Sequence, residues 1–135
     1  MGKLRVLFVD DEPNVLGGLR RMLRNMRNEW HMEFVEGGQK ALDLLDGHEF
    51  DVIVSDMRMP GINGVDLLKK VMESHPQIVR IILSGQSDEG LLRETVGVTH
   101  HFLSKPCSPD VLRSIVRDAV VAHVRSAEKD VAHEG

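Results

Sequence analysis

Three aspartates, a serine and a lysine are the residues of this sequence that could do chemistry together. Asp10 and Asp11 follow the apolar run "LRVLFV", Asp56 follows "DVIVS", Ser84 ends "VRIILS" and Lys105 follows "HHFLS". If the carboxylates meet while ionised, each pair repels by roughly 4 kcal/mol at about 4 Å and an effective dielectric near 20. A cation must therefore join them, and oxygen ligands without a nearby histidine or thiolate favour a hard divalent ion such as Mg²⁺.

The lysine and the Ser84-Gly85 pair indicate that an anion is held beside the metal. A lysine ammonium is a compact charge suited to a phosphate oxygen, and a serine hydroxyl and the backbone N–H of a small residue both donate hydrogen bonds. An aspartate carboxylate can attack phosphorus to form an aspartyl phosphate. The pattern predicts a phosphoryl pocket in which an aspartate could be the nucleophile.

Short apolar segments and amphipathic segments alternate along the chain, and they must position these residues. The first, third and fourth apolar segments are almost continuously hydrophobic, which is typical of strands covered on both faces. Pro13 suits the first turn of the first helix, and Ser108 is a natural N-cap for the last one, ahead of Pro109. The predicted strands are 4–9, 32–36, 51–55, 79–84 and 100–104, and the predicted helices are 13–26, a short one around 41–45, 65–74, 88–96 and a last one from 109.

The alternation predicts an α/β domain with a five-stranded parallel sheet, right-handed crossovers and helices on both faces, a doubly wound arrangement. Ligands of such sheets bind outside the carboxyl ends of the strands, where all five residues above are placed. Taken singly, Asp10 or Asp11 could simply cap the first helix, and Lys105 could be a surface lysine. Their joint placement at one sheet edge favours a site.

Composition limits the class of protein. The 135 residues fit one domain, the net charge of −4 argues against nucleic acid as a direct partner, and no apolar run is long enough to span a membrane. A single cysteine, Cys107, excludes an internal disulfide and fits the cytoplasm, and we interpret it as an incidental loop thiol. A local basic cluster has two interpretations, a solvated helix face or a docking patch for an acidic partner; it comprises Arg20, Arg21, Arg24 and Arg27, with Lys3 and Arg5 nearby in sequence.

Some other side chains receive simpler interpretations. His100 and His101 are adjacent on a predicted strand, so they point to opposite faces, and a metal site there is disfavoured. The methionines recur in helical stripes and are expected in the core, with Met57 and Met59 as the exceptions in the pocket loop.

Four motifs together resemble the receiver domain of bacterial two-component response regulators. They are "LFVDDEP", "VIVSDMRMPGINGVDLL", "IILSGQ" and "HFLSKPCSPDVL", and the resemblance covers about Leu4 to Val121. It implies a flavodoxin-like (βα)5 fold. We therefore expect a receiver domain over residues 1–124, followed by a tail or linker over 125–135 that leads to an output domain outside this chain.

The resemblance also implies a role for each residue of the pocket. Asp56 would be the phosphoacceptor, and Ser84 and Lys105 would bind phosphoryl oxygens with the backbone N–H groups of Met57 and Gly85. Mg²⁺ would be held by Asp11, Asp56 and the backbone carbonyl of Arg58, with Asp10 contributing through water.

Partners and switching follow from the same resemblance. The phosphoryl donor would be a sensor histidine kinase or a phosphotransfer protein, and the chain would catalyse only its own phosphotransfer and dephosphorylation, so it is not expected to be an enzyme for other substrates. Phosphorylation would draw the Ser84 hydroxyl inward and open space for Phe102. The surface of helix 88–96, the fifth strand and the last helix would then shift and bind an output domain, an effector protein or a second copy of the chain.

Three other functions make demands on the sequence that differ from those of a receiver. A phosphorylation-independent receiver-like scaffold would not need the intact set of Asp10, Asp11, Asp56, Ser84 and Lys105. A metal-dependent phosphatase or phosphotransferase would need a second acid/base residue beside the nucleophile, and position 58 is arginine. A nucleotide-binding domain would need a G-x-G-x-x-G motif or a P-loop after the first strand, and neither is present.

Overall fold

The computed structural model describes residues 2–85, 97–105 and 107–134; the side chains of Ser84 and of residues 125–134 are outside this description. The predicted helix 88–96 also falls outside the described residues. The elements, in chain order, are β1 (Leu4–Asp10), α1 (Pro13–Met22), the 3₁₀ helix η1 (Arg24–Asn28), β2 (Trp30–Glu36), α2 (Gly38–Leu45), β3 (Val52–Asp56), α3 (Gly64–Ser74), β4 (Val79–Ser84), β5 (His101–Ser104) and α5 (Pro109–Glu134).

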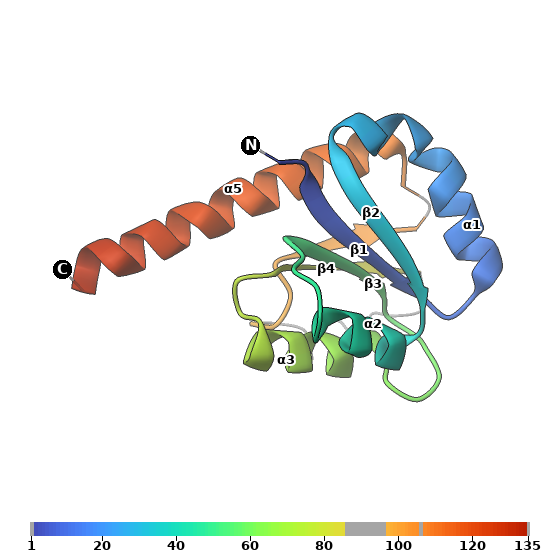
Figure 1. Cartoon of the computed structure of the whole chain (residues 1–135), viewed down its shortest axis with the longest axis horizontal. Helices are drawn as coiled ribbons and strands as arrows, with labels where there is room; N and C mark the ends of the chain where they lie inside the picture. Colours follow the sequence, from blue (N-terminus) through green and yellow to red (C-terminus); the bar gives the residue numbers. More distant parts are fainter. Residues whose placement is uncertain (1, 86–96, 106, 135) are drawn as a thin grey trace.

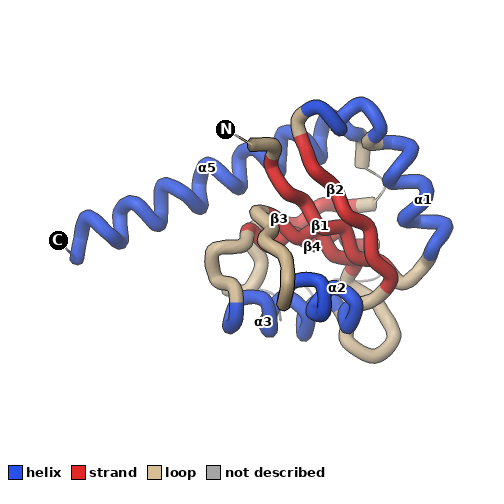
Figure 2. Tube along the Cα trace, in the orientation of Figure 1, coloured by secondary structure: helices blue, strands red, loops and turns tan. Residues whose placement is uncertain are grey.

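One parallel sheet organises the chain, with its strands in the order β2-β1-β3-β4-β5. Figure 1 shows α1 and α5 on one side of this sheet and α2 and α3 on the other, and the tube in Figure 2 shows the same layers. The predicted doubly wound α/β fold is confirmed. The reversal of strand order between β1 and β3 makes their carboxyl ends the expected place for a ligand.

Two apolar cores fill the two sides of the sheet. One joins Leu7 and Ile53 to α2 and α3, and the other joins Phe8 and Val54 to α1, η1 and α5. Consecutive residues of β1 and β3 therefore serve opposite cores, because strand side chains alternate between faces. This is why these strands are apolar at almost every position.

Met57 and Met59 belong to the first of these cores, so the expectation that they stand apart from it is wrong. Met57 is fully buried and Met59 is 7% exposed, among residues of α2 and α3. Both lie in a loop, where no helical or strand period marks the inward positions. The loop after β3 is thus anchored by its own side chains.

The first helix and β2 differ from their predicted bounds. The apolar pattern predicted one helix from Pro13 to Met26, but α1 ends at Met22 and η1 carries the chain onward. The tighter coil keeps Leu23 and Met26 buried while the chain turns into β2. This strand begins at Trp30, two residues earlier than predicted, because Trp30 and His31 pair with the first two residues of β1.

The last helix begins as predicted and is longer than its apolar stripe. The Ser108 hydroxyl accepts a hydrogen bond from the N–H of Val111 at 3.2 Å, which caps the helix start at Pro109. The backbone stays helical to Glu134, and Figure 1 shows the final turns extending away from the sheet. Alanine, glutamate, lysine and arginine are strong helix formers, which favours helix here without an apolar face. Among the described residues, no helix combines the length and hydropathy that a membrane crossing requires.

Arg80 is a buried charge that the sequence pattern did not single out. Its side chain is held by backbone carbonyls: Nε donates to Val98 at 2.6 Å, and Nη1 donates to Ile78 at 3.0 Å and to Pro76 at 3.3 Å. Its backbone N–H donates to Nδ1 of His100 at 2.9 Å. These bonds join the amino end of β4 to the residues just before β5.

Candidate functional site

The three predicted aspartates converge at the carboxyl ends of β1 and β3. Asp10 is the last residue of β1, Asp11 follows it, and Asp56 is the last residue of β3. These strands are neighbours in the sheet, and each aspartate offers a carboxylate oxygen within 4.8 Å of those of the other two. Asp10 is buried, while Asp11 and Asp56 are partly exposed, so the cluster opens toward solvent on one side.

Asp10 is held in place by the chain that follows it. Its Oδ1 accepts a hydrogen bond from the backbone N–H of Glu12 at 3.0 Å. Glu12 is the N-cap residue of α1, so neither Asp10 nor Asp11 occupies the capping position that the simpler interpretation gave them. Burial raises the pKa of Asp10, as do the negative charges of Asp56 and Asp11, although the Glu12 hydrogen bond and Lys105 oppose this rise.

Lys105 reaches into this cluster from the end of β5. Its Nζ lies 2.7 Å from Oδ1 of Asp56 and 3.5 Å from Oδ2 of Asp10. Partial burial alone would lower the pKa of Lys105, but the hydrogen bond to Asp56 and the attraction of both carboxylates outweigh it and raise that pKa. The ammonium is therefore charged at neutral pH and offsets part of the carboxylate repulsion.

The donor set fits a hard divalent cation. Three carboxylates supply oxygen atoms only, and they carry more negative charge than one lysine can balance. Asp11 makes no hydrogen bond or ion pair among the described residues, and one of its carboxylate oxygens lies within 4.8 Å of those of Asp10 and Asp56, close enough for one ion to contact all three. The assignment of Asp10, Asp11 and Asp56 as Mg²⁺ ligands stays a prediction, for which the structure supplies a cluster of three carboxylates.

The loop from β3 to α3 fixes the backbone around Asp56. The Ser55 hydroxyl donates to the Asp56 carbonyl at 2.9 Å, and the Gly64 N–H donates to the Met57 carbonyl at 2.8 Å. A Cβ on Gly64 would overlap the Asp56 carbonyl oxygen and lie 2.9 Å from Cα of Met57. This requirement for glycine depends on a close approach between backbone segments that are distant in the sequence, so no local sequence pattern indicates it.

The remaining predicted residues lie around the same edge of the sheet. Ser84 ends β4 opposite Ser104 of β5, and its side chain is outside the described residues. Gly85 and Arg58 are described and each has an interaction with a neighbour. Phe102, on β5, is 37% exposed. Cys107 is a free, half-buried thiol beyond β5, and burial raises its pKa, which suits the incidental role.

A partly buried acidic cluster with a lysine lies at the carboxyl ends of a doubly wound parallel sheet. Sequence comparison identifies the family of signalling domains to which this arrangement belongs. The model of the response regulator receiver domain matches residues 6–117. This chain belongs to that family.

Individual relatives agree with this assignment. The chain is 40% identical over 119 residues to the hydrogenase transcriptional regulatory protein HoxA of Cupriavidus necator, covering 87% of this chain and 24% of HoxA. The signal receiver domain of an HD domain-containing protein from Pseudomonas fluorescens has a TM-score of 0.83 at 25% identity, covering 92% of this chain and 99% of that one. The response regulator TrrA of Thermotoga maritima, solved with Mg(2+)-BeF, has a TM-score of 0.74 at 24% identity, covering 86% and 98%, which is a likeness of fold.

The curated relatives are longer than this chain. It spans about a quarter of HoxA and of the C4-dicarboxylate transport regulator DctD of Pseudomonas aeruginosa. The shared part is the receiver domain alone, so the rest of those proteins says nothing direct about this one.

Proposed function

We propose that this receiver accepts a phosphoryl group on Asp56 from the phosphohistidine of a sensor kinase or phosphotransfer protein. The observation that carries the proposal is the contact of Lys105 with Asp56 at 2.7 Å beside two further carboxylates. Of the three aspartates, Asp56 makes the closest ion pair with Lys105, and it is partly exposed, so a donor can approach it.

In the proposed step, a carboxylate oxygen of Asp56 attacks phosphorus. The new P–O bond forms as the P–N bond to the donor imidazole breaks, and the departing imidazole takes up a proton from water. Lys105 then binds a phosphoryl oxygen, helped by the backbone N–H groups of Met57 and Gly85 and by the Ser84 hydroxyl. The residues act by positioning and charge neutralisation, which is most of what phosphoryl transfer requires.

Mg²⁺ would be held by Asp11, Asp56 and the Arg58 carbonyl, with Asp10 contributing through water. It supplies positive charge that lowers the repulsion between the carboxylates and the incoming phosphoryl group. Burial of Asp10 and its raised pKa support this assignment, because a buried carboxylate needs a nearby cation to stabilise its ionised form.

The output surface proposed here includes β5 and α5. Phe102 on β5 and Val111, Val121 and Val124 on α5 are large apolar side chains that remain exposed. They suit contact with an output domain, an effector or a second copy of the chain after phosphorylation. We also propose a cytoplasmic location, where the domain would meet the kinase domain of its partner.

The test is incubation with acetyl phosphate and Mg²⁺ followed by intact-protein mass spectrometry. The wild type should gain one phosphoryl group, because the carboxylate of Asp56 displaces acetate from phosphorus. Asp56→Asn should gain none, and Asp46→Asn, which changes an exposed acid at the end of α2, should label like the wild type.

Two results would contradict the proposal. One is a wild type that stays unlabelled under conditions that label another receiver domain, which would favour a phosphorylation-independent scaffold. The other is labelling of Asp56→Asn to the wild-type extent, which would place the phosphoryl group elsewhere.

A further inference from the structure

A basic groove lies along the free edge of β2. It has a volume of about 400 Å³. Because β2 is the first strand in the order of the sheet, one of its edges has no strand partner among the described residues. We define the β2 groove by its nine lining residues: Lys3, Arg20, Arg24, Arg27, Trp30, His31, Met32, Glu33 and Phe34.

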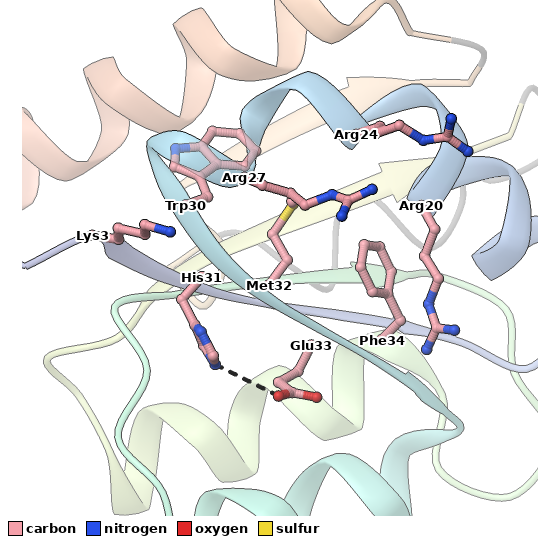
Figure 3. A pocket seen from close by; sticks show the side chains of 9 residues that line it. All are labelled: Lys3, Arg20, Arg24, Arg27, Trp30, His31, Met32, Glu33 and Phe34. Atoms are coloured by element: carbon pink, nitrogen blue, oxygen red, sulfur yellow. Dashed lines mark ion pairs between the residues drawn. The ribbon is translucent and has the colours of Figure 1, made fainter.

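Positive charge dominates this groove, although the chain as a whole is acidic. Arg20, Arg24 and Arg27 recur along α1 and η1 and line one wall, and Figure 3 shows them on one side of β2 with the His31 and Glu33 pair on the other. Glu33 is the single acid of the groove, and its Oε1 lies 3.6 Å from Nε2 of His31.

The cations of the groove lack acidic partners. Lys3 and the three arginines are all exposed, and none makes an ion pair with any residue in the described part of the chain. The guanidinium of Arg20 lies over the Phe34 ring, 5.1 Å from its centroid, which keeps it close to the strand. Four unpaired cations around one hollow favour an anionic ligand.

We propose that the β2 groove binds an extended acidic segment of a partner protein, which adds to the sheet as a strand beside β2. The unpaired strand edge offers main-chain donors and acceptors, and alternate side chains of an added strand point to the arginine wall. Glutamates at alternate positions of the segment then meet the arginines and Lys3, while the residues between them face His31 and Glu33.

Nucleic acid suits this groove less well. Trp30 is only 5% exposed and Phe34 is covered by Arg20, so neither ring offers a free face on which a base could stack. Glu33 would also repel a continuous phosphate backbone. Nucleic acid binding is therefore an alternative outcome of the test.

The groove is separate from the aspartate site. Asp10 pairs in register with Glu36 at the carboxyl end of β2, whereas the groove is lined from Trp30 at the amino end to Phe34. Both can be occupied at once. The proposal does not depend on phosphorylation, and Asp56→Asn should bind the acidic segment as the wild type does.

The experiment measures fluorescence anisotropy of a labelled twelve-residue peptide of alternating glutamate and threonine, at physiological salt. The wild type should bind it, and the matched peptide of alternating glutamine and threonine should not. Arg24→Glu with Arg27→Glu should weaken binding at least tenfold. Arg21→Glu, the same charge change at an exposed position of α1 outside the groove, should change binding less than twofold.

Strand addition has its own control. N-methylation of alternate backbone amides of the peptide removes donors to β2 without altering charge, and it should abolish binding. Undiminished binding would overturn the strand geometry. The proposal fails as a whole if the wild type ignores the acidic peptide, if Arg21→Glu weakens binding as much as the groove variant, or if a twelve-nucleotide single-stranded DNA binds more tightly and is lost with Arg24 and Arg27. Since all substituted arginines are exposed, circular dichroism and urea denaturation should match the wild type.

Discussion

Replacing Gly64 with alanine should displace the backbone of Asp56, the proposed phosphoacceptor, without changing its side chain. The added methyl would overlap the carbonyl oxygen of Asp56 and lie 2.9 Å from Cα of Met57. Carbon atoms in contact normally stay about 3.5 to 4.0 Å apart, so the backbone at Met57 has to move by at least roughly 0.5 Å. The nearest atoms all belong to the backbone of Asp56 and Met57, so no flexible side chain can rotate out of the way.

The cost follows from overpacking in a buried site. Inserted methyl groups typically cost about 1 to 3 kcal/mol, and a clash with backbone belongs at the upper end, so we expect a loss of ~3 kcal/mol in the free energy of unfolding. For a domain of this size that lowers Tm by roughly 10 °C. Natural domains have about 5 to 15 kcal/mol of stability, so Gly64→Ala should still fold at 25 °C.

The same displacement should slow phosphorylation. A misplacement of about 1 Å can cost on the order of 100-fold in rate, so the smaller shift here should slow labelling of Asp56 by acetyl phosphate on the order of tenfold or more. The assay is urea denaturation combined with the time course of the phosphoryl adduct in intact-protein mass spectra.

Gly18→Ala is the matched control for Gly64→Ala. Gly18 lies within α1, and a Cβ there meets no atom within 4 Å. Alanine should therefore raise the free energy of unfolding by about 0.5 to 1 kcal/mol through helix propensity, with unchanged labelling. The reasoning is refuted if Gly64→Ala has the wild-type urea midpoint and labels at the wild-type rate.

Two further predictions concern charge. Lys105→Met should lower the free energy of unfolding by about 1 kcal/mol in EDTA, because the carboxylates lose a partly exposed cation, and Mg²⁺ should stabilise this variant more than the wild type. Lys40→Met, at an exposed site, should leave both the stability in EDTA and the response to Mg²⁺ unchanged. An equal Mg²⁺ response in Lys105→Met and the wild type would contradict the prediction. Burial, followed by the charges of Arg80 and His123, lowers the pKa of His100 from 6.5 to about 4. The unfolded chain therefore binds a proton at His100 more tightly than the folded chain, and the free energy of unfolding falls as the pH drops from 6.5 toward 4. Because the ring is partly exposed, this loss of stability should be only about 1 kcal/mol. His100→Asn should reduce the pH dependence of the urea midpoint, and His101→Asn should not. The same pH dependence in the wild type and both variants would show that His100 is not its source.

The aspartate site was largely predictable because its residues stand at strand ends. The apolar runs before Asp10, Asp56 and Lys105 are bounded by residues that strands avoid, and parallel strands place their carboxyl ends at one edge. The direct ion pair of Lys105 with Asp56, at 2.7 Å, follows from strand order, which no local pattern carries.

What the sequence concealed depends on contacts between distant segments. Met57 and Met59 are core residues of a loop without a period, and the need for glycine at position 64 appears only when β3 and α3 are packed together. The choice between a solvated helix face and a docking patch for the basic cluster likewise needs the positions of the side chains in the fold. Arg24 and Arg27 line the β2 groove, whereas Arg21, one residue from Arg20 in the chain, is not among its lining residues.

Arg80 joins β4 and β5 more firmly at their amino ends than at their carboxyl ends. Its guanidinium donates to the carbonyls of Val98, Ile78 and Pro76, so the amino ends of β4 and β5 are fastened together by a cation that has no carboxylate partner among the described side chains. Separating them would leave buried polar groups unpaired, which is costly. The carboxyl ends of the same two strands carry Ser84 and Lys105. Movement that starts at the carboxyl ends should therefore pivot about Arg80, at the amino ends of the two strands, opposite the end of the sheet that carries the aspartates.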